Sequence, residues 1–164
     1  VIYMEKQAVW ERLHEDKFWE KQNCIIVTSQ GQTTRGIRRL LQVLNDEHDL
    51  PIYVLADFDP WGFYIYSVLK FGSINLAHMS GTMTLQNARF LGITADDATN
   101  YDLTRLKQIA EYDWFKKNKA WQRQFKMMKD FGAKLEIQAL SSKGITFISE
   151  KYLPEKIKRQ EFLD

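Results

Sequence analysis

The stretch PIYVLADFDP, from Pro51 to Pro60, decides the fold of this 164-residue chain. Its apolar run, 52–56, is short, contains β-branched and aromatic residues and follows a proline, a pattern that predicts a buried strand. The loop after this run holds Asp57 and Asp59. Pro60 then suits the first turn of a helix, where a missing backbone N–H costs nothing. The sequence therefore predicts a buried strand, an acidic loop and a helix in succession.

Similar units occur on either side of this stretch, through about the first 80 residues. The apolar runs are continuous, as in parallel strands that are buried on both faces, and amphipathic stretches separate them. We therefore predict an α/β fold of Rossmann-like type, in which helices flank a parallel central sheet and the crossovers are right-handed. The predicted strands are 1–4, 24–28, 52–56 and 73–77, and the predicted helices are 6–21, 35–48 with Thr34 as its cap, and 60–71.

The second half of the chain predicts a mostly helical elaboration of this sheet. Helical patterns occur at 104–110 and 114–131, with weaker ones at 135–140 and 152–162. A length of 164 residues fits one domain. We expect a single domain over 1–164, with a core at about 1–80 and the elaboration at about 81–164. Because Val1 already lies in a strand-like run, we also expect the chain to be a piece of a longer protein.

Composition excludes several classes of protein. The single cysteine, Cys24, cannot form an internal disulfide and fits a reducing compartment. No run approaches the roughly 18 apolar residues that a membrane span needs, and no signal peptide is visible, so we expect an intracellular protein without a membrane partner. A net charge of +2 is too small to argue for nucleic-acid binding by itself.

Three carboxylates follow predicted strands. Glu5 comes after the first strand, and Asp57 and Asp59 come after the third. Ligands of open parallel sheets bind beyond the carboxyl ends of the strands, and alternate residues of an extended segment project to the same side. If the first and third strands are neighbours, the three side chains face one pocket. Their mutual repulsion would favour a bound cation, and Mg²⁺ prefers such hard oxygen ligands.

The D-x-D spacing alone leaves other readings open. Asp59 precedes Pro60 and can simply cap the helix, in which case the loop needs no metal. A phosphohydrolase of the haloacid-dehalogenase type also places D-x-D after a strand, usually the N-terminal one. A third reading is a non-catalytic module that holds DNA or dimerises, with acids that only cap helices.

Several motifs resemble the Toprim domain of topoisomerase VI A subunits, the type IIB DNA topoisomerases, and of the related meiotic double-strand-break proteins. The resemblance covers nearly the whole chain, and its central motif is highly specific. The motifs are IYME at 2–5, AVWERL at 8–13, TRGIRRLL at 34–41, LPIYVLADFDPWGFYIYS at 50–67 and KYLPEKI at 151–157. One departure is Thr33, where the family usually has a proline before the Thr-Arg pair.

The resemblance implies a Toprim fold and a role in transient double-strand DNA cleavage and religation. In this family a tyrosine attacks the DNA backbone, and the Toprim acids hold Mg²⁺ beside the phosphate. Glu5 matches the family's glutamate, which is a metal ligand and a candidate general acid for the leaving 3′ oxygen. Asp57 and Asp59 match its metal-binding pair.

The A subunits of this family form a homodimer and act with an ATPase B subunit, which makes the full complex an ATP-dependent isomerase. The nucleophilic tyrosine lies in an N-terminal winged-helix domain that we expect to be absent from this chain. We therefore expect this chain alone not to cleave DNA. A cytoplasmic or nucleoid-associated location is also expected.

Basic residues follow the polar loop at 29–33. Arg35, Arg38 and Arg39 begin the predicted helix on the same rim as the acids. Arg35 matches a family arginine, and phosphate positioning is a reasonable role for Arg35 and Arg38. The alternative reading is a solvated helix face.

Overall fold

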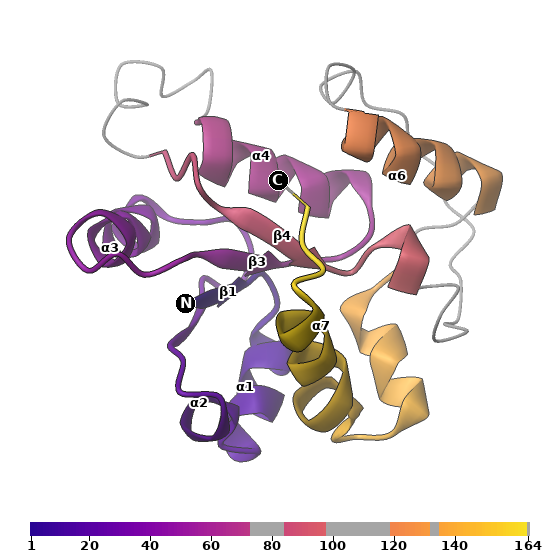
Figure 1. Cartoon of the computed structure of the whole chain (residues 1–164), viewed down its shortest axis with the longest axis horizontal. Coiled ribbons are helices and arrows are strands. Elements are labelled where there is room, and N and C mark those ends of the chain that lie inside the picture. Colours follow the sequence, from indigo (N-terminus) through magenta and orange to yellow (C-terminus); the bar gives the residue numbers. More distant parts are fainter. Residues whose placement is uncertain (73–83, 98–118, 132–134, 164) are drawn as a thin grey trace.

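The computed structural model describes residues 1–72, 84–97, 119–131 and 135–163 (Figure 1). Four strands form one parallel sheet in the order β2-β1-β3-β4. A parallel sheet is what the sequence predicts, and the strand order is a finding of the structure. Each strand is short, and most of its residues are buried or half-buried. The strands are β1 (Ile2–Met4), β2 (Ile26–Thr28), β3 (Tyr53–Leu55) and β4 (Arg89–Gly92).

The strand order places a topological switch point between β1 and β3. The chain leaves β1 toward β2 on one side, and it leaves β3 toward β4 on the other. The two central strands pair in register, with Ile2 opposite Tyr53 and Met4 opposite Leu55. The residues that follow Met4 and Leu55 therefore emerge side by side at the carboxyl edge of the sheet, where open α/β sheets bind ligands.

Helices cover both faces of the sheet. Figure 1 shows α4 on one side, and α1, α2 and α7 on the opposite side. The side chain of Thr34 accepts a hydrogen bond from the Ile37 amide and caps α3, as predicted. The helices are α1 (Gln7–Glu15), α2 (Phe18–Lys21), α3 (Arg35–Asp46), α4 (Pro60–Phe71), α6 (Lys119–Phe131) and α7 (Leu153–Arg159), with a 3₁₀ segment η3 (Ile137–Lys143) and a π-helical segment η4 (Ile148–Tyr152).

The predicted single helix at 6–21 is wrong, because it is two helices that meet at Lys17. Lys17 has a left-handed backbone with φ of 50°. At 100° per residue, a continuous helix would point Phe18 about 140° away from the buried Leu13. The break instead lets Phe18 enter the core, where its side chain is fully buried.

The fourth strand was not predicted where it occurs. β4 begins with the exposed Arg89 and ends with Gly92, so its apolar run is only two residues long. The predicted strand at 73–77 and the predicted helix at 104–110 lie outside the described residues, as does the first part of the predicted helix at 114–131. Of the weak helical candidates, 152–162 contains α7 and 135–140 overlaps η3.

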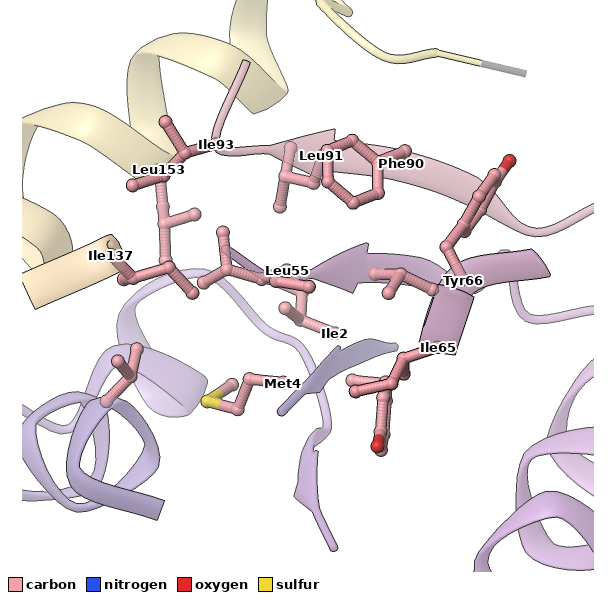
Figure 2. Close-up of a cluster of buried hydrophobic side chains, with 14 of the residues drawn as sticks. Ile2, Met4, Leu55, Ile65, Tyr66, Phe90, Leu91, Ile93, Ile137 and Leu153 are labelled. Carbon is pink, nitrogen blue, oxygen red and sulfur yellow. The ribbon is translucent and has the colours of Figure 1, made fainter. Parts of the chain in front are cut away.

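The core joins the strands to the C-terminal segments. Figure 2 shows Ile2 and Met4 of β1, Leu55 of β3 and Phe90 of β4 in one cluster with Ile137 and Leu153. Those six side chains are at most 2% exposed. The described segments that contain Ile137 and Leu153 therefore belong to the same hydrophobic core as the strands.

Candidate metal centre

Two of the predicted acids lie at the switch point of the sheet. The Glu5 amide donates to the Leu55 carbonyl over 3.2 Å, so Glu5 extends the pairing of β1 with β3 by one residue. Asp57 comes two residues after β3. Both residues are buried, with Glu5 9% and Asp57 5% exposed. We call Glu5, Asp57 and the nearby Asp59 the acidic edge.

The Glu5 carboxyl group is incompletely satisfied. Its Oε2 atom is buried and has no hydrogen-bond partner. Burial, followed by repulsion from Asp57 and Asp59, raises the pKa of Glu5 from 4.5 to about 7. A buried carboxylate oxygen without a donor is costly, so this atom is suited to accept a cation or to carry a proton.

Asp57 is held from two directions. Its Oδ1 atom accepts a hydrogen bond of 2.8 Å from the backbone N–H of Ile137, and its Oδ2 atom lies 2.6 Å from the ammonium group of Lys6. Burial raises the pKa of Asp57, and the hydrogen bonds from Lys6 and Ile137 oppose this effect. The carboxylate thus has a fixed orientation and one immediate counter-ion.

Asp59 begins α4. Its Oδ1 atom accepts a 2.7 Å hydrogen bond from the Gly62 amide. Asp59 thus caps the helix, as its place before Pro60 predicts. Its negative charge also raises the pKa of Glu5. Asp59 therefore caps the helix and belongs electrostatically to the acidic edge.

The donor set fits Mg²⁺ in chemistry. The three residues supply hard carboxylate oxygens, and Glu5 offers a buried oxygen that no protein group satisfies. As arranged here, the side chains are not a closed ligand set: in the described ranges, no three His, Cys, Asp or Glu residues come close enough together to hold a metal ion. Water and phosphate oxygens would have to complete the shell, as is usual for Mg²⁺.

The polar loop at 29–33 packs beside Glu5. The buried Tyr3 hydroxyl contacts Ser29 Oγ at 2.6 Å and Thr33 Oγ1 at 2.9 Å, and the Gly31 amide donates to the Glu5 carbonyl at 3.0 Å. A proline at position 33 would lack the hydroxyl group that Thr33 offers to Tyr3. The loop is therefore fixed here by side-chain hydrogen bonds.

The two predicted DNA-contacting arginines differ in environment. Arg35 is exposed at the start of α3. Arg38 is only 9% exposed, and its Nε donates to the Thr33 carbonyl over 3.4 Å. Both assignments stay predictions, and Arg35 has the geometry better suited to an external phosphate.

Sequence reasoning missed the residues that support Asp57. Lys6 could have been predicted as a counter-ion of the acids, because it is a cation directly after Glu5 in the sequence. Ile137, Glu136 and Gln138 gave no such signal, since only the fold brings them to the acidic edge. Gly62 was also missed. It matters because a Cβ at this position would lie 2.3 Å from the Asp57 carbonyl oxygen, which only the structure shows.

No helix in the parts of the chain that the structure describes has the length and apolar character needed to cross a membrane.

Comparison with known proteins identifies relatives along the whole chain. The family model for the Toprim domain of the topoisomerase 6 A-subunit/Spo11 proteins matches residues 1–157. The chain is 41% identical to the A-subunit of type 2 DNA topoisomerase 6 from Pyrococcus abyssi, with 99% of this chain and 48% of the relative covered. It is 39% identical to the protein of that name from Sulfurisphaera tokodaii, with coverage of 100% and 48%. For the protein from Methanocaldococcus jannaschii the identity is 36%, with coverage of 96% and 46%.

The chain thus spans about half the length of the curated relatives that it matches. The parallel sheet, the acids at its switch point and these matches agree on one assignment. The chain belongs to the Toprim family of the topoisomerase 6 A-subunit and Spo11 proteins.

Proposed function

We propose that this chain is the Mg²⁺-binding Toprim part of the A-subunit of a type IIB DNA topoisomerase. The observation that carries the proposal is the buried Oε2 atom of Glu5, which lacks a partner at the switch point next to Asp57. Glu5, Asp57 and Asp59 would hold the ion. When bound, Mg²⁺ would neutralise charge that develops on a phosphate and on its leaving oxygen.

Each acid of the chain has a distinct role in this proposal. Asp57 is oriented by the Ile137 amide and presents a fixed carboxylate. Asp59 is restrained by its bond to Gly62. Glu5, whose pKa is raised to about 7 in the metal-free protein, is the candidate donor of a proton to the leaving 3′ oxygen.

The wider function depends on parts outside this chain. The relatives are named as the A-subunit of a type 2 DNA topoisomerase. By that likeness, the proposed substrate is DNA, and the proposed partners are an ATPase B subunit together with a second copy of the A-subunit. The nucleophilic tyrosine would come from a winged-helix domain. We expect the chain alone to form no covalent adduct with DNA, and recovery of an adduct on one of its tyrosines would contradict this.

The test is calorimetric titration of Mg²⁺ into this chain, beside a variant that carries Glu5→Gln and Asp57→Asn. Saturable binding that the variant loses is the expected result. Glu47→Gln is the matched control, because Glu47 is an exposed acid at the end of α3. Absence of binding, even with a nicked duplex present to supply phosphate oxygens, would overturn the metal-site proposal.

The second candidate is a non-catalytic role, and two contacts of the acids argue for it. The Lys6 ion pair and the Asp59 cap would both stabilise the fold without any metal. The titration separates this alternative from the first proposal.

A haloacid-dehalogenase activity is disfavoured because the D-x-D motif follows the third strand, whereas in that class it usually follows the N-terminal strand. The family model that matches the chain is also a different one, the Toprim domain. Turnover of a generic phosphatase substrate would reinstate this activity.

DNA contact by Arg35 is a separate part of the proposal. Its exposed guanidinium lies after the loop that packs beside Glu5. We expect Arg35→Ala to weaken duplex binding and to reduce the slope of log affinity against log salt by about one. An unchanged affinity and slope would remove Arg35 from the DNA-contacting surface.

A further inference from the structure

Lys6 lies at the acidic edge because of its place in the chain. It follows Glu5 directly and has an extended backbone at the N-cap position of α1, without a side-chain capping bond. Its ammonium group is 2.6 Å from Asp57 Oδ2 and 2.7 Å from Gln138 Oε1. Its side chain is 23% exposed, so it can leave this position without passing through the core.

Asp57 has few ways to accept both Lys6 and a divalent cation. Oδ1 accepts a hydrogen bond from the Ile137 amide and Oδ2 lies against Lys6, so a cation would have to share one of these two oxygens. A cation bound at Oδ2 would lie close to the ammonium group, and like charges at such a distance repel strongly in a partly buried site. Binding of the ion at this atom therefore favours movement of Lys6.

A second acceptor lies within reach of the lysine. Glu136 Oε2 is 3.8 Å from the Lys6 ammonium group, and the Glu136 side chain is 40% exposed. The four-carbon stem of lysine is flexible and lets the charge move by a few ångströms. Glu136 can therefore take over the ion pair while Gln138 remains beside it.

We propose that Lys6 is an exchangeable counter-ion, which neutralises Asp57 until a divalent cation binds there and then transfers its ion pair to Glu136. This inference rests on the proposed metal site and adds a competitor built into the chain. It makes Lys6 a positioning residue that sets the affinity of the acidic edge for the ion. The exchange also avoids an uncompensated buried Asp57 at any stage.

The test measures Mg²⁺ affinity and thermal unfolding for Lys6→Met, which keeps the apolar stem and removes the charge. Without Mg²⁺, the variant should unfold at a lower temperature than the wild type. Its Mg²⁺ dissociation constant should be roughly three- to tenfold lower, because a competing charge is gone. Lys6→Arg keeps the charge and should bind Mg²⁺ no more tightly than the wild type, and Lys158→Met, at an exposed lysine of α7, should change neither quantity.

Glu136→Gln gives the complementary result, since it removes the acceptor of the displaced lysine. We expect weaker Mg²⁺ binding in this variant, and little effect of Glu136→Gln when Lys6→Met is already present. Two additive effects would point to long-range electrostatics alone and would overturn the exchange.

The outcomes separate the two proposals. If the wild type binds Mg²⁺ and Lys6→Met binds it with the same affinity, the exchange is wrong and the metal site stands. If neither protein binds Mg²⁺ even with a nicked duplex, both proposals fail. Binding by Lys6→Met where the wild type shows none would support the exchange directly.

Discussion

The fold changes the protonation of the Glu5 carboxyl group. Its pKa rises from 4.5 to about 7, mainly through burial. Between these two pH values the folded chain binds more protons at Glu5 than the unfolded chain does. The free energy of unfolding contributed by Glu5 therefore falls as the pH rises from about 4.5 to about 7, and stays low above that.

We expect Glu5→Gln to remove this decline in metal-free buffer. At about pH 8 the variant should be roughly 1–2 kcal/mol more stable than the wild type, a figure reduced from the full electrostatic value because charges inside proteins are screened more than in a rigid apolar medium. Urea unfolding at about pH 5 and pH 8 measures the difference, with Glu47→Gln as the control. Parallel pH profiles for wild type and Glu5→Gln would contradict the raised pKa.

Gly62 fixes the distance between α4 and the acidic loop. A Cβ at this position would meet the Asp57 carbonyl oxygen at 2.3 Å, so the backbone of Asp57 must move in Gly62→Ala. We expect a loss of about 1–3 kcal/mol in the free energy of unfolding and weaker Mg²⁺ binding. Gly36→Ala, in α3 with nothing within 4 Å of the added carbon, is the matched control and should be neutral or stabilising. Equal effects of the two substitutions would show that the close approach is not what matters.

Position after a predicted strand made the acids candidates, and the family resemblance then selected them as metal ligands, an assignment that stays a prediction. Glu5 and Asp57 follow apolar runs, and position after a strand is what makes a carboxylate a candidate ligand in such a fold. The sequence alone does not predict that β1 and β3 are neighbours, because the apolar runs carry no information about strand order. The structure shows that they are.

At the scale of an element, α4 depends on a residue with two roles. Asp59 caps the helix through the Gly62 amide and contributes charge to the acidic edge. Asparagine caps as well as aspartate but has no charge. We therefore expect Asp59→Ala to cost about 0.5–2 kcal/mol of stability, and Asp59→Asn to retain stability.

Both Asp59 variants should bind Mg²⁺ more weakly than the wild type. Thermal unfolding and calorimetry on the same samples separate the cap from the ligand. Full Mg²⁺ affinity in Asp59→Asn would assign Asp59 to the cap alone.

Element boundaries were predicted well where local signals act, and poorly where packing decides. Thr34 and Asp59 cap helices as their residue types indicate. The break at Lys17 was missed, because the reason for it is the place of Phe18 in the core and not a local glycine or proline. The short β4 was missed because the neighbouring β3, and not its own two apolar residues, stabilises it as a strand.

At the scale of the whole molecule, a buried ion pair between Asp97 and Lys156 connects the segment that follows β4 to α7. Asp97 Oδ2 accepts from Lys156 Nζ and from the Tyr152 hydroxyl, each at 2.8 Å, and Asp97 and Lys156 are each 2% exposed. Thr94 completes the set through its amide and hydroxyl groups. The segment after β4 is thereby fixed to η4 and α7.

We expect Lys156→Met to lower the free energy of unfolding by about 3–5 kcal/mol, because it leaves the Asp97 carboxylate buried without its cation. Lys158→Met, two positions away on the exposed side of α7, should change stability by less than about 0.5 kcal/mol. Chemical denaturation gives both values. Addition of Asp97→Asn to Lys156→Met should recover part of the loss; a further loss would mean that Asp97 acts mainly through Thr94 and Tyr152.

The overall arrangement was predictable only in part. The α/β class and the parallel sheet follow from continuous apolar runs between amphipathic stretches. The return of residues 135–138 to the acidic edge does not, since Ile137 and Asp57 are 80 positions apart and nothing local relates them. The same distance hides the pairing of Phe58 with Leu135.

That pairing has a consequence for the order of folding. Strands β1 and β3 and both ends of the acidic loop leave the ribosome well before Leu135 and Ile137, and contacts between distant positions form late because the intervening loop must close first. Pulsed hydrogen exchange during refolding should therefore find the Ile137 amide protected after those of β1 and β3. In this order of folding, a nascent chain carries its acids long before Asp57 is oriented, so the metal site proposed at the acidic edge would be complete only after Ile137 has been synthesised and docked.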